Sequence, residues 1–143
     1  MVVMLGLQFG AGRQSRESEG HDRSSIELPG QQGALVSALR AANPTKPIVG
    51  LLVHGGTLAL GEAGTQLDAI MSAWYPGLAG GQAIASTLFG DYSPAGRSPT
   101  TWYRATSDLV AAGDQQENDG SGMTYRCRAY GRRCGCEGRL FWL

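Results

Sequence analysis

The stretch that decides the fold reads PIVGLLV, residues 47–53, and it runs directly into HGGT, residues 54–57. It is a short apolar run with no alternating polar residues. Such a run is typical of a strand covered on both faces, as in a parallel sheet. Two other runs share the pattern, VVMLGL at 2–7 and AIMSAWY at 69–75. We therefore expect three buried parallel strands.

Helical patterns separate these strands and follow the last of them. Leu35, Leu39 and Ala42 recur at helical spacing, and an Asn-Pro pair then ends the helix. A second pattern places Ile84 and Leu88 on one face together with Ala85 and Phe89, before a terminal glycine. The expected helices are 30–43, 58–68 and 80–90, and TTWYR at 100–104 is expected to form a final strand.

The alternation of strand and helix predicts an α/β domain, a three-layer sandwich whose mostly parallel sheet is flanked by helices. We place this domain in residues 1–104. A polar stretch rich in Asp, Gln, Asn and Gly opens the next segment, 105–126. The last segment, 127–143, has a different composition and contains all three cysteines, so we treat it as an atypical tail.

Composition and motifs exclude several classes of function. The chain has 12 basic and 12 acidic residues, so no net charge draws it to nucleic acid or to an anionic membrane. Its apolar runs are far shorter than the roughly 20 residues that span a bilayer. No signal peptide is visible, so the sequence leaves the cellular location unknown.

Sites for bound groups are also not indicated. GAGRQS at 10–15 lacks the third glycine of a dinucleotide-binding turn, and no phosphate-binding P-loop or nucleophile-elbow motif is present. The cysteine spacing C-x-C and two scattered histidines do not favour a metal site. We expect neither a metal nor a cofactor.

The charged stretch SRESEGHDR, residues 15–23, follows the first predicted strand. An open parallel sheet binds ligands outside the carboxyl ends of its strands. This stretch, HGGT at 54–57 and PGLAGG at 76–81 should meet at that edge. The glycines would let a ligand approach the backbone closely. From the residues alone, the stretch could equally be a solvated loop.

Residues 74–103 read WYPGLAGGQAIASTLFGDYSPAGRSPTTWY. They resemble the signature W-x-P-G-x-x-G-G-x-A-I-A-x-x-L-F-G-D-x-x-P-x-G-R-L-P-x-T-x-Y of the C-terminal α/β sandwich domain of glycoside hydrolase family 3. Ser98 stands where that signature has Leu. The resemblance implies the same sandwich fold, as part of a larger enzyme.

Three further stretches extend the resemblance to about residues 1–126. SEGHDRSSIELPGQQGALVSAL, 18–39, is similar to the E-x-E-G-x-D-R-x-x-L-x-L-P-G-x-Q-x-x-L-V pattern of the β-xylosidase and α-L-arabinofuranosidase branch. LLVHGGTLAL, 51–60, resembles that branch's V-L-x-x-G-G-P-V-x-V, with Thr57 in place of Pro. GMTYR, 122–126, resembles G-R-T-Y-R.

The resemblance implies a retaining glycosidase that removes terminal β-xylosyl or arabinosyl (or glucosyl) residues from oligosaccharides. Such enzymes use two carboxylates, a nucleophile and an acid/base. In this family an Asp nucleophile lies on a separate N-terminal (β/α)8 barrel, and the acid/base is a Glu of the sandwich domain. The E-x-E motif maps it to Glu17, with Glu19 as the alternative. Loss of water in an interdomain cleft would raise the pKa of such a carboxyl.

The remaining candidate residues support the loop or bind substrate. Asp22 and Arg23 are expected to hold the loop that carries Glu17. His54, Gly55 and Gly56 follow the second strand and are expected to contact substrate or to support that loop.

The sequence departs from the family in ways that affect the expected activity. The family places its first glutamate closer to the glycine that corresponds to Gly6, so the loop before Glu17 is longer here. A barrel needs about 250 residues and does not fit in this chain. We therefore expect weak or no activity from the chain alone.

The alternative is a non-catalytic sugar-binding or interaction domain without a barrel. Full-length relatives are commonly secreted.

Overall fold

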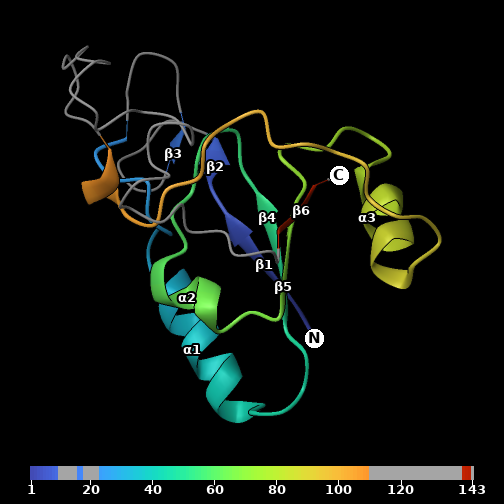
Figure 1. The fold of residues 1–143 in the computed structure, drawn as a ribbon, viewed down its shortest axis with the longest axis horizontal. Coiled ribbons are helices and arrows are strands. Elements are labelled where there is room, and N and C mark those ends of the chain that lie inside the picture. Colours follow the sequence, from blue (N-terminus) through green and yellow to red (C-terminus); the bar gives the residue numbers. More distant parts are fainter. Residues whose placement is uncertain (10–15, 18–22, 110–139, 143) are drawn as a thin grey trace, which may run out of the picture.

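The computed structural model describes residues 1–9, 16–17, 23–109 and 140–142, and the structural statements below concern these residues. A four-stranded sheet forms the centre of the domain, and all of its strand pairs are parallel (Figure 1). Its strands, in spatial order, are β1 (Val2–Gly6), β4 (Val49–Val53), β5 (Ala69–Ser72) and β6 (Leu140–Trp142). The first three are the strands expected from the apolar runs.

Helices cover both faces of this sheet and give it three layers. Figure 1 shows α1 (Gln32–Ala42) and α2 (Gly61–Thr65) on one side and α3 (Gly80–Phe89) on the other. Neighbouring residues of one strand serve opposite faces, because side chains alternate along a strand. Leu52 belongs to the cluster that contains Val36 of α1, whereas Leu51 lies in the cluster that Ile84 of α3 covers. The predicted three-layer α/β sandwich is confirmed.

The buried stripe of α1 is displaced by one residue from the predicted one. Val36 is fully buried, whereas Leu35 is 47% exposed and Ala42 is also exposed. Leu39 packs against the core from its edge, as expected. The helix therefore turns Val36 and Leu39, which are three residues apart, toward the sheet.

Helix α3 follows the prediction at its end and on its buried side. Ile84 and Leu88 pack against Leu51 and its neighbours on the sheet. Gly90 ends the helix in the left-handed conformation, with φ of 84°, which glycine adopts without strain. The prediction that Ala85 and Phe89 share this buried face is wrong: Ala85 is exposed and Phe89 is 86% exposed.

The expected strand at 100–104 is wrong. This stretch forms no strand, and it precedes a short 3-10 helix, η1 (Thr106–Asp108). Its Trp102 is buried in the core, and the indole Nε1 donates to Ser98 Oγ at 3.2 Å. Ser98, which departs from the family signature, thus gives the buried indole its acceptor. The fourth strand is instead β6, in the segment treated as an atypical tail, and Leu140 pairs with Ile70.

A second, small sheet follows β1 directly. Strands β2 (Gln8–Phe9) and β3 (Arg16–Glu17) run parallel and pair Gln8 with Arg16 and Phe9 with Glu17. This pairing closes the lengthened loop before Glu17. Residues 10–15, which make up the rest of that loop, lie outside the described residues.

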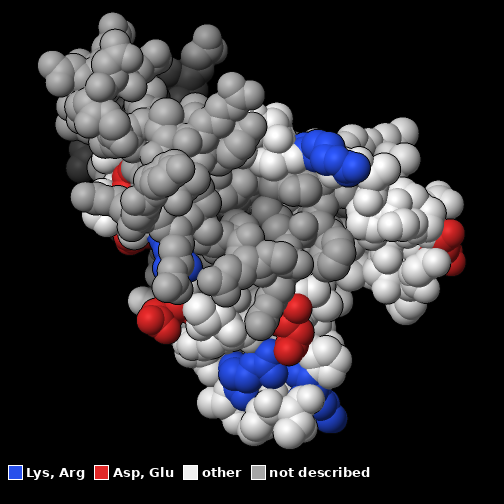
Figure 2. Space-filling view, viewed as in Figure 1, with Lys and Arg blue, Asp and Glu red and all other residues white. Residues whose placement is uncertain are grey.

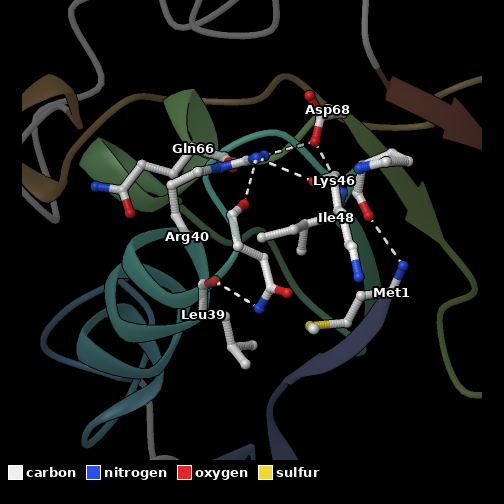
Figure 3. Close-up of polar contacts among 9 residues, drawn as sticks. Met1, Leu39, Arg40, Lys46, Ile48, Gln66 and Asp68 are labelled. Carbon is white, nitrogen blue, oxygen red and sulfur yellow. Dashed lines mark hydrogen bonds and ion pairs between the residues drawn. The ribbon is translucent and has the colours of Figure 1, made fainter.

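Arg40 ties together the opposite edge of the main sheet, where its strands begin (Figure 3). The guanidinium donates to Gln66 O at 2.7 and 2.9 Å and to Lys46 O at 3.1 Å, and it pairs with Asp68 Oδ2 at 2.5 Å. The same Asp68 oxygen accepts from the backbone N–H of Ile48 at 2.7 Å. One side chain of α1 therefore fixes the segments that lead into β4 and β5.

The charged side chains on the surface agree with the equal numbers of acidic and basic residues in the sequence. On the face seen in Figure 2, the acidic and basic side chains of the described residues lie in small groups, and near α1 the two signs are adjacent. No helix among the described residues is long and apolar enough to cross a membrane.

Replacing Gly6 by Ala should destabilise the domain severely. Gly6 has φ of 147°, and a Cβ there would lie 1.8 Å from Val53 O. We expect G6A to lower the free energy of unfolding by at least about 3 kcal/mol, measured by urea denaturation. Gly33→Ala is the control, because nothing lies within 4 Å of its added Cβ, and it should raise stability by about 0.5 kcal/mol. Equal stabilities for the two variants would contradict the close approach of β1 and β4.

Replacing Arg40 by Lys should destabilise the domain although it keeps the charge. The guanidinium bonds Gln66, Lys46 and Asp68 from three separate nitrogens, whereas Lys has one ammonium nitrogen, which cannot occupy all three positions. We expect a loss of about 1–2 kcal/mol in unfolding free energy by chemical denaturation. Arg97→Lys is the matched control. Among the described residues, Arg97 bonds only the nearby carbonyls of Ala95 and Gly96, so its effect should stay below about 0.5 kcal/mol. Similar losses for both variants would show that Arg40 does not join these segments.

Candidate active site

The carboxyl ends of β1, β4 and β5 meet at one edge of the sheet, as the sequence predicted. Just beyond the strands, Leu7 N–H donates to Val53 O at 2.9 Å, and His54 N–H donates to Trp74 O at 3.2 Å. The residues that leave the three strands are therefore direct neighbours. This is the edge at which open parallel sheets bind ligands.

His54 lies at the centre of this edge and is fully buried. Its Nδ1 is 2.6 Å from Gly56 O, and its Nε2 is 2.8 Å from Ser72 Oγ. A carbonyl oxygen can only accept, so Nδ1 carries a proton. In the neutral ring, Nε2 then accepts from the Ser72 hydroxyl. The geometry thus assigns the tautomer and joins β5 to the turn at 54–57.

Two tryptophans enclose this histidine. The Trp74 ring is tilted against it at a centroid distance of 4.7 Å, and Trp102 meets it edge-on at 5.3 Å. Trp74 adopts φ of 51°, a left-handed conformation that costs a residue with a side chain about 1–2 kcal/mol. The surrounding contacts therefore hold Trp74 in a backbone conformation that it would not choose alone.

Ser72 and His54 have the separation of a nucleophile and its base, but they cannot act as such. Both side chains have no exposed surface, so a substrate cannot reach Ser72 Oγ. The pair is part of the scaffold of this edge.

Arg23 fastens the end of the charged stretch to the turn after β4. Its Nη2 donates to Thr57 O at 2.7 Å, and its Nη1 donates to Ser25 O at 3.5 Å. Close by, Ala59 N–H donates to Ile26 O at 2.7 Å. The segment that leaves the charged stretch therefore runs along residues 57–59.

Glu17 enters this region from the other end of the charged stretch. Its backbone belongs to β3 and pairs with Phe9, shortly after β1 ends. Glu19 and Asp22, the other acidic candidates, lie outside the described residues. The structure thus brings the backbone of Glu17, Arg23 and the turn that holds His54, Gly55 and Gly56 to the edge after β1 and β4.

Gln32 is a positioning side chain that the sequence reasoning missed. Its Oε1 accepts from Gly6 N–H at 2.8 Å, and its Nε2 donates to Gly6 O at 2.9 Å. The amide thereby satisfies both polar groups of the last residue of β1. The available signal was the Gln of the L-P-G-x-Q pattern. Ser72 and Trp102 were also missed; Ser72 stands out in the sequence only as a hydroxyl residue in an apolar run.

The glycines near this edge have different roles. Gly56 supplies the carbonyl that His54 bonds. A Cβ on Gly80 would lie 2.3 Å from Pro76 Cβ, so Gly80 permits the close entry into α3. A Cβ on Gly81 would meet nothing within 4 Å, so the space around this position does not require a glycine. Among the described residues, no group of three or more His, Cys, Asp or Glu could hold a metal ion.

Known proteins are similar to this chain in sequence and in fold. Residues 1–134 match the glycosyl hydrolase family 3 C-terminal domain. A probable β-D-xylosidase 6 of Arabidopsis thaliana is 37% identical over 91% of the chain, and a xylan 1,4-β-xylosidase of Xylanibacter ruminicola is 41% identical over 76% of it. The crystal structure of a β-glucosidase from Kluyveromyces marxianus matches 75% of the chain with a TM-score of 0.63 and 31% identity.

The chain is short beside these relatives. It spans 16% of the Arabidopsis protein, 12% of the Xylanibacter protein and 12% of the chain of the Kluyveromyces enzyme. The family match nevertheless covers most of its residues, and the parallel three-layer sandwich agrees with it. The chain belongs to glycoside hydrolase family 3, within the C-terminal domain of that family.

Proposed function

We propose that this chain supplies the general acid/base of a retaining family 3 glycosidase, and that Glu17 is that residue. The observation that carries the proposal is the pairing of Glu17 with Phe9, which keeps the glutamate beside the carboxyl end of β1 although the loop before it is long. Arg23, bonded to Thr57 O, supports the proposal from the other end of the charged stretch. Glu19 is the alternative acid/base.

The proposed substrates are oligosaccharides that end in β-linked xylose, in arabinose or in glucose. The relatives named above are called xylosidases and a glucosidase, and others are called β-xylosidase/α-L-arabinofuranosidase. The sugar pocket itself is expected mainly on a (β/α)8 barrel that also provides the Asp nucleophile. His54 is buried and is proposed to support the loop rather than to contact the sugar.

The reaction proceeds in two displacements. The barrel Asp attacks the anomeric carbon while the Glu17 carboxylic acid gives its proton to the departing glycosidic oxygen. The Glu17 carboxylate then takes a proton from water, and the resulting hydroxide displaces the Asp from the anomeric carbon. Glu17 ends protonated, and the released sugar keeps its configuration.

The first prediction of this proposal concerns the chain by itself. Only one of the two carboxylates is assigned to it, so hydrolysis of an aryl β-xyloside should stay at the background rate. The released phenol is followed by absorbance. Robust turnover that persists in a variant lacking both Glu17 and Glu19 would contradict the proposed mechanism.

The second prediction assigns the acid/base in a hybrid enzyme. Residues of this chain replace the matched stretch of the Xylanibacter ruminicola xylosidase, which supplies the remainder. With xylobiose, E17Q should lower kcat/KM by at least about 100-fold, because the leaving sugar needs a proton. With 2,4-dinitrophenyl xyloside, whose leaving group needs none, kcat/KM should stay close to that of the parent hybrid.

Glu19→Gln is the matched control in the same hybrid. It should leave the ratio of the two kcat/KM values unchanged. The reverse result, with the selective loss in E19Q, would move the assignment to Glu19. A hybrid that folds without turnover, together with xylose binding by the 143-residue chain alone, would support a non-catalytic sugar-binding domain instead.

A further inference from the structure

Three hydrogen bonds and the peptide link between Gly56 and Thr57 connect the buried core to the charged stretch. Ser72 of β5 bonds His54 Nε2, and His54 Nδ1 bonds Gly56 O. The next residue, Thr57, offers its carbonyl to Arg23. The path thus starts on strand β5 and ends at Arg23, the last residue of the charged stretch.

We infer that His54 is a positioning residue for Arg23, the last residue of the charged stretch, and that it acts through its Nδ1–H bond to Gly56 O. This bond fixes the direction of the peptide groups in the turn at 54–57. It thereby places Thr57 O where Arg23 can reach it. The catalytic meaning of this role rests on the proposed function of Glu17, but the positioning itself does not.

The burial of the histidine explains why such a bond would matter. With no exposed surface, neither ring nitrogen can exchange its partner for water. Each lost bond would leave a buried polar group unpaired, which costs more than a surface bond. The ring between Trp74 and Trp102 also has little room to turn. The turn therefore has one favoured conformation while Nδ1 holds Gly56.

The competing explanation is that His54 only fills space between the two tryptophans. The positioning role depends on the Nδ1 atom, whereas the space-filling role depends on the size of the side chain. A pair of amide variants separates the two roles. In H54N, the side-chain nitrogen can take the place of Nδ1 and still donate to Gly56 O. In H54Q, the amide reaches toward Ser72, as Nε2 does, and the bond to Gly56 is lost.

The experiment measures amide hydrogen exchange by NMR on the 143-residue chain. Two amides report on the residues beside Arg23 and its partner Thr57: Ala59, which donates to Ile26 O, and Ile26, which donates to Thr106 Oγ1. The amide of Asp68, which donates to Ile48 O at the opposite edge of the sheet, is the internal control. It corrects for any general loss of stability.

The positioning role predicts different outcomes for the two variants. In H54Q, exchange at Ala59 and Ile26 should become about tenfold faster relative to Asp68. In H54N, both ratios should stay within about twofold of the wild-type chain. Equal acceleration in both variants, or a larger effect in H54N, would overturn the inference, because a space-filling ring favours the larger Gln.

Two further measurements apply even if a variant at His54 does not fold. In the unchanged chain, ¹⁵N NMR of the ring should find the proton on Nδ1, and a ring protonated only on Nε2 would overturn the inference. Arg23→Met should accelerate exchange at Ala59 and Ile26 and leave the His54 ring signals in place. Unchanged exchange in R23M would contradict the proposed link between His54 and Arg23.

These readouts require no turnover. A negative exchange result removes His54 from the positioning of Arg23 and leaves the acid/base assignment to the hybrid enzyme. Loss of that assignment in the hybrid leaves the exchange result standing as a structural role.

Discussion

The close approach of Gly6 to Val53 is the constraint on which the arrangement of the site depends. Only a residue without a side chain can take φ of 147° there, because a Cβ would overlap Val53 O. The Gln32 amide bonds both polar groups of the same glycine. Strand β1 thus ends at a fixed place beside β4, and the chain leaves it toward β2, which pairs with the strand of Glu17.

Polar side chains fix the sheet at both of its edges, but in different ways. At the edge where the strands begin, Arg40 joins its neighbours from a partly exposed position. At the carboxyl edge, His54 and Ser72 are fully buried and their partners cannot be replaced by water. A site for catalysis needs a preorganised scaffold. The buried pair of His54 and Ser72 supplies a more rigid scaffold than the partly exposed contacts of Arg40 do. The loops can then vary in length, as the one before Glu17 does.

The apolar runs were enough to predict β1, β4 and β5, because burial on both faces leaves a direct signal in the sequence. The helical spacing of apolar residues predicted α1 and α3. Strand β6 was missed because Leu140 and its two neighbours are too short a run to stand out. Trp102 was assigned to a strand, but it belongs to an irregular segment from which its side chain reaches into the core. For the site, sheet topology correctly predicted that the residues just after β1, β4 and β5 are neighbours. The partnership of His54 with Ser72 depends on the register between β4 and β5, which one sequence does not reveal.

The central claim is that this chain contributes a glutamate that serves first as acid and then as base. Chemical rescue by azide tests it most directly in the hybrid with the Xylanibacter ruminicola enzyme. Azide needs no base to attack the glycosyl-enzyme, so it can replace water when the carboxyl is missing. The account predicts that E17A in sodium azide regains turnover of 2,4-dinitrophenyl xyloside and releases β-xylosyl azide. Rescue in E19A but not in E17A, or a product of inverted configuration, would contradict it.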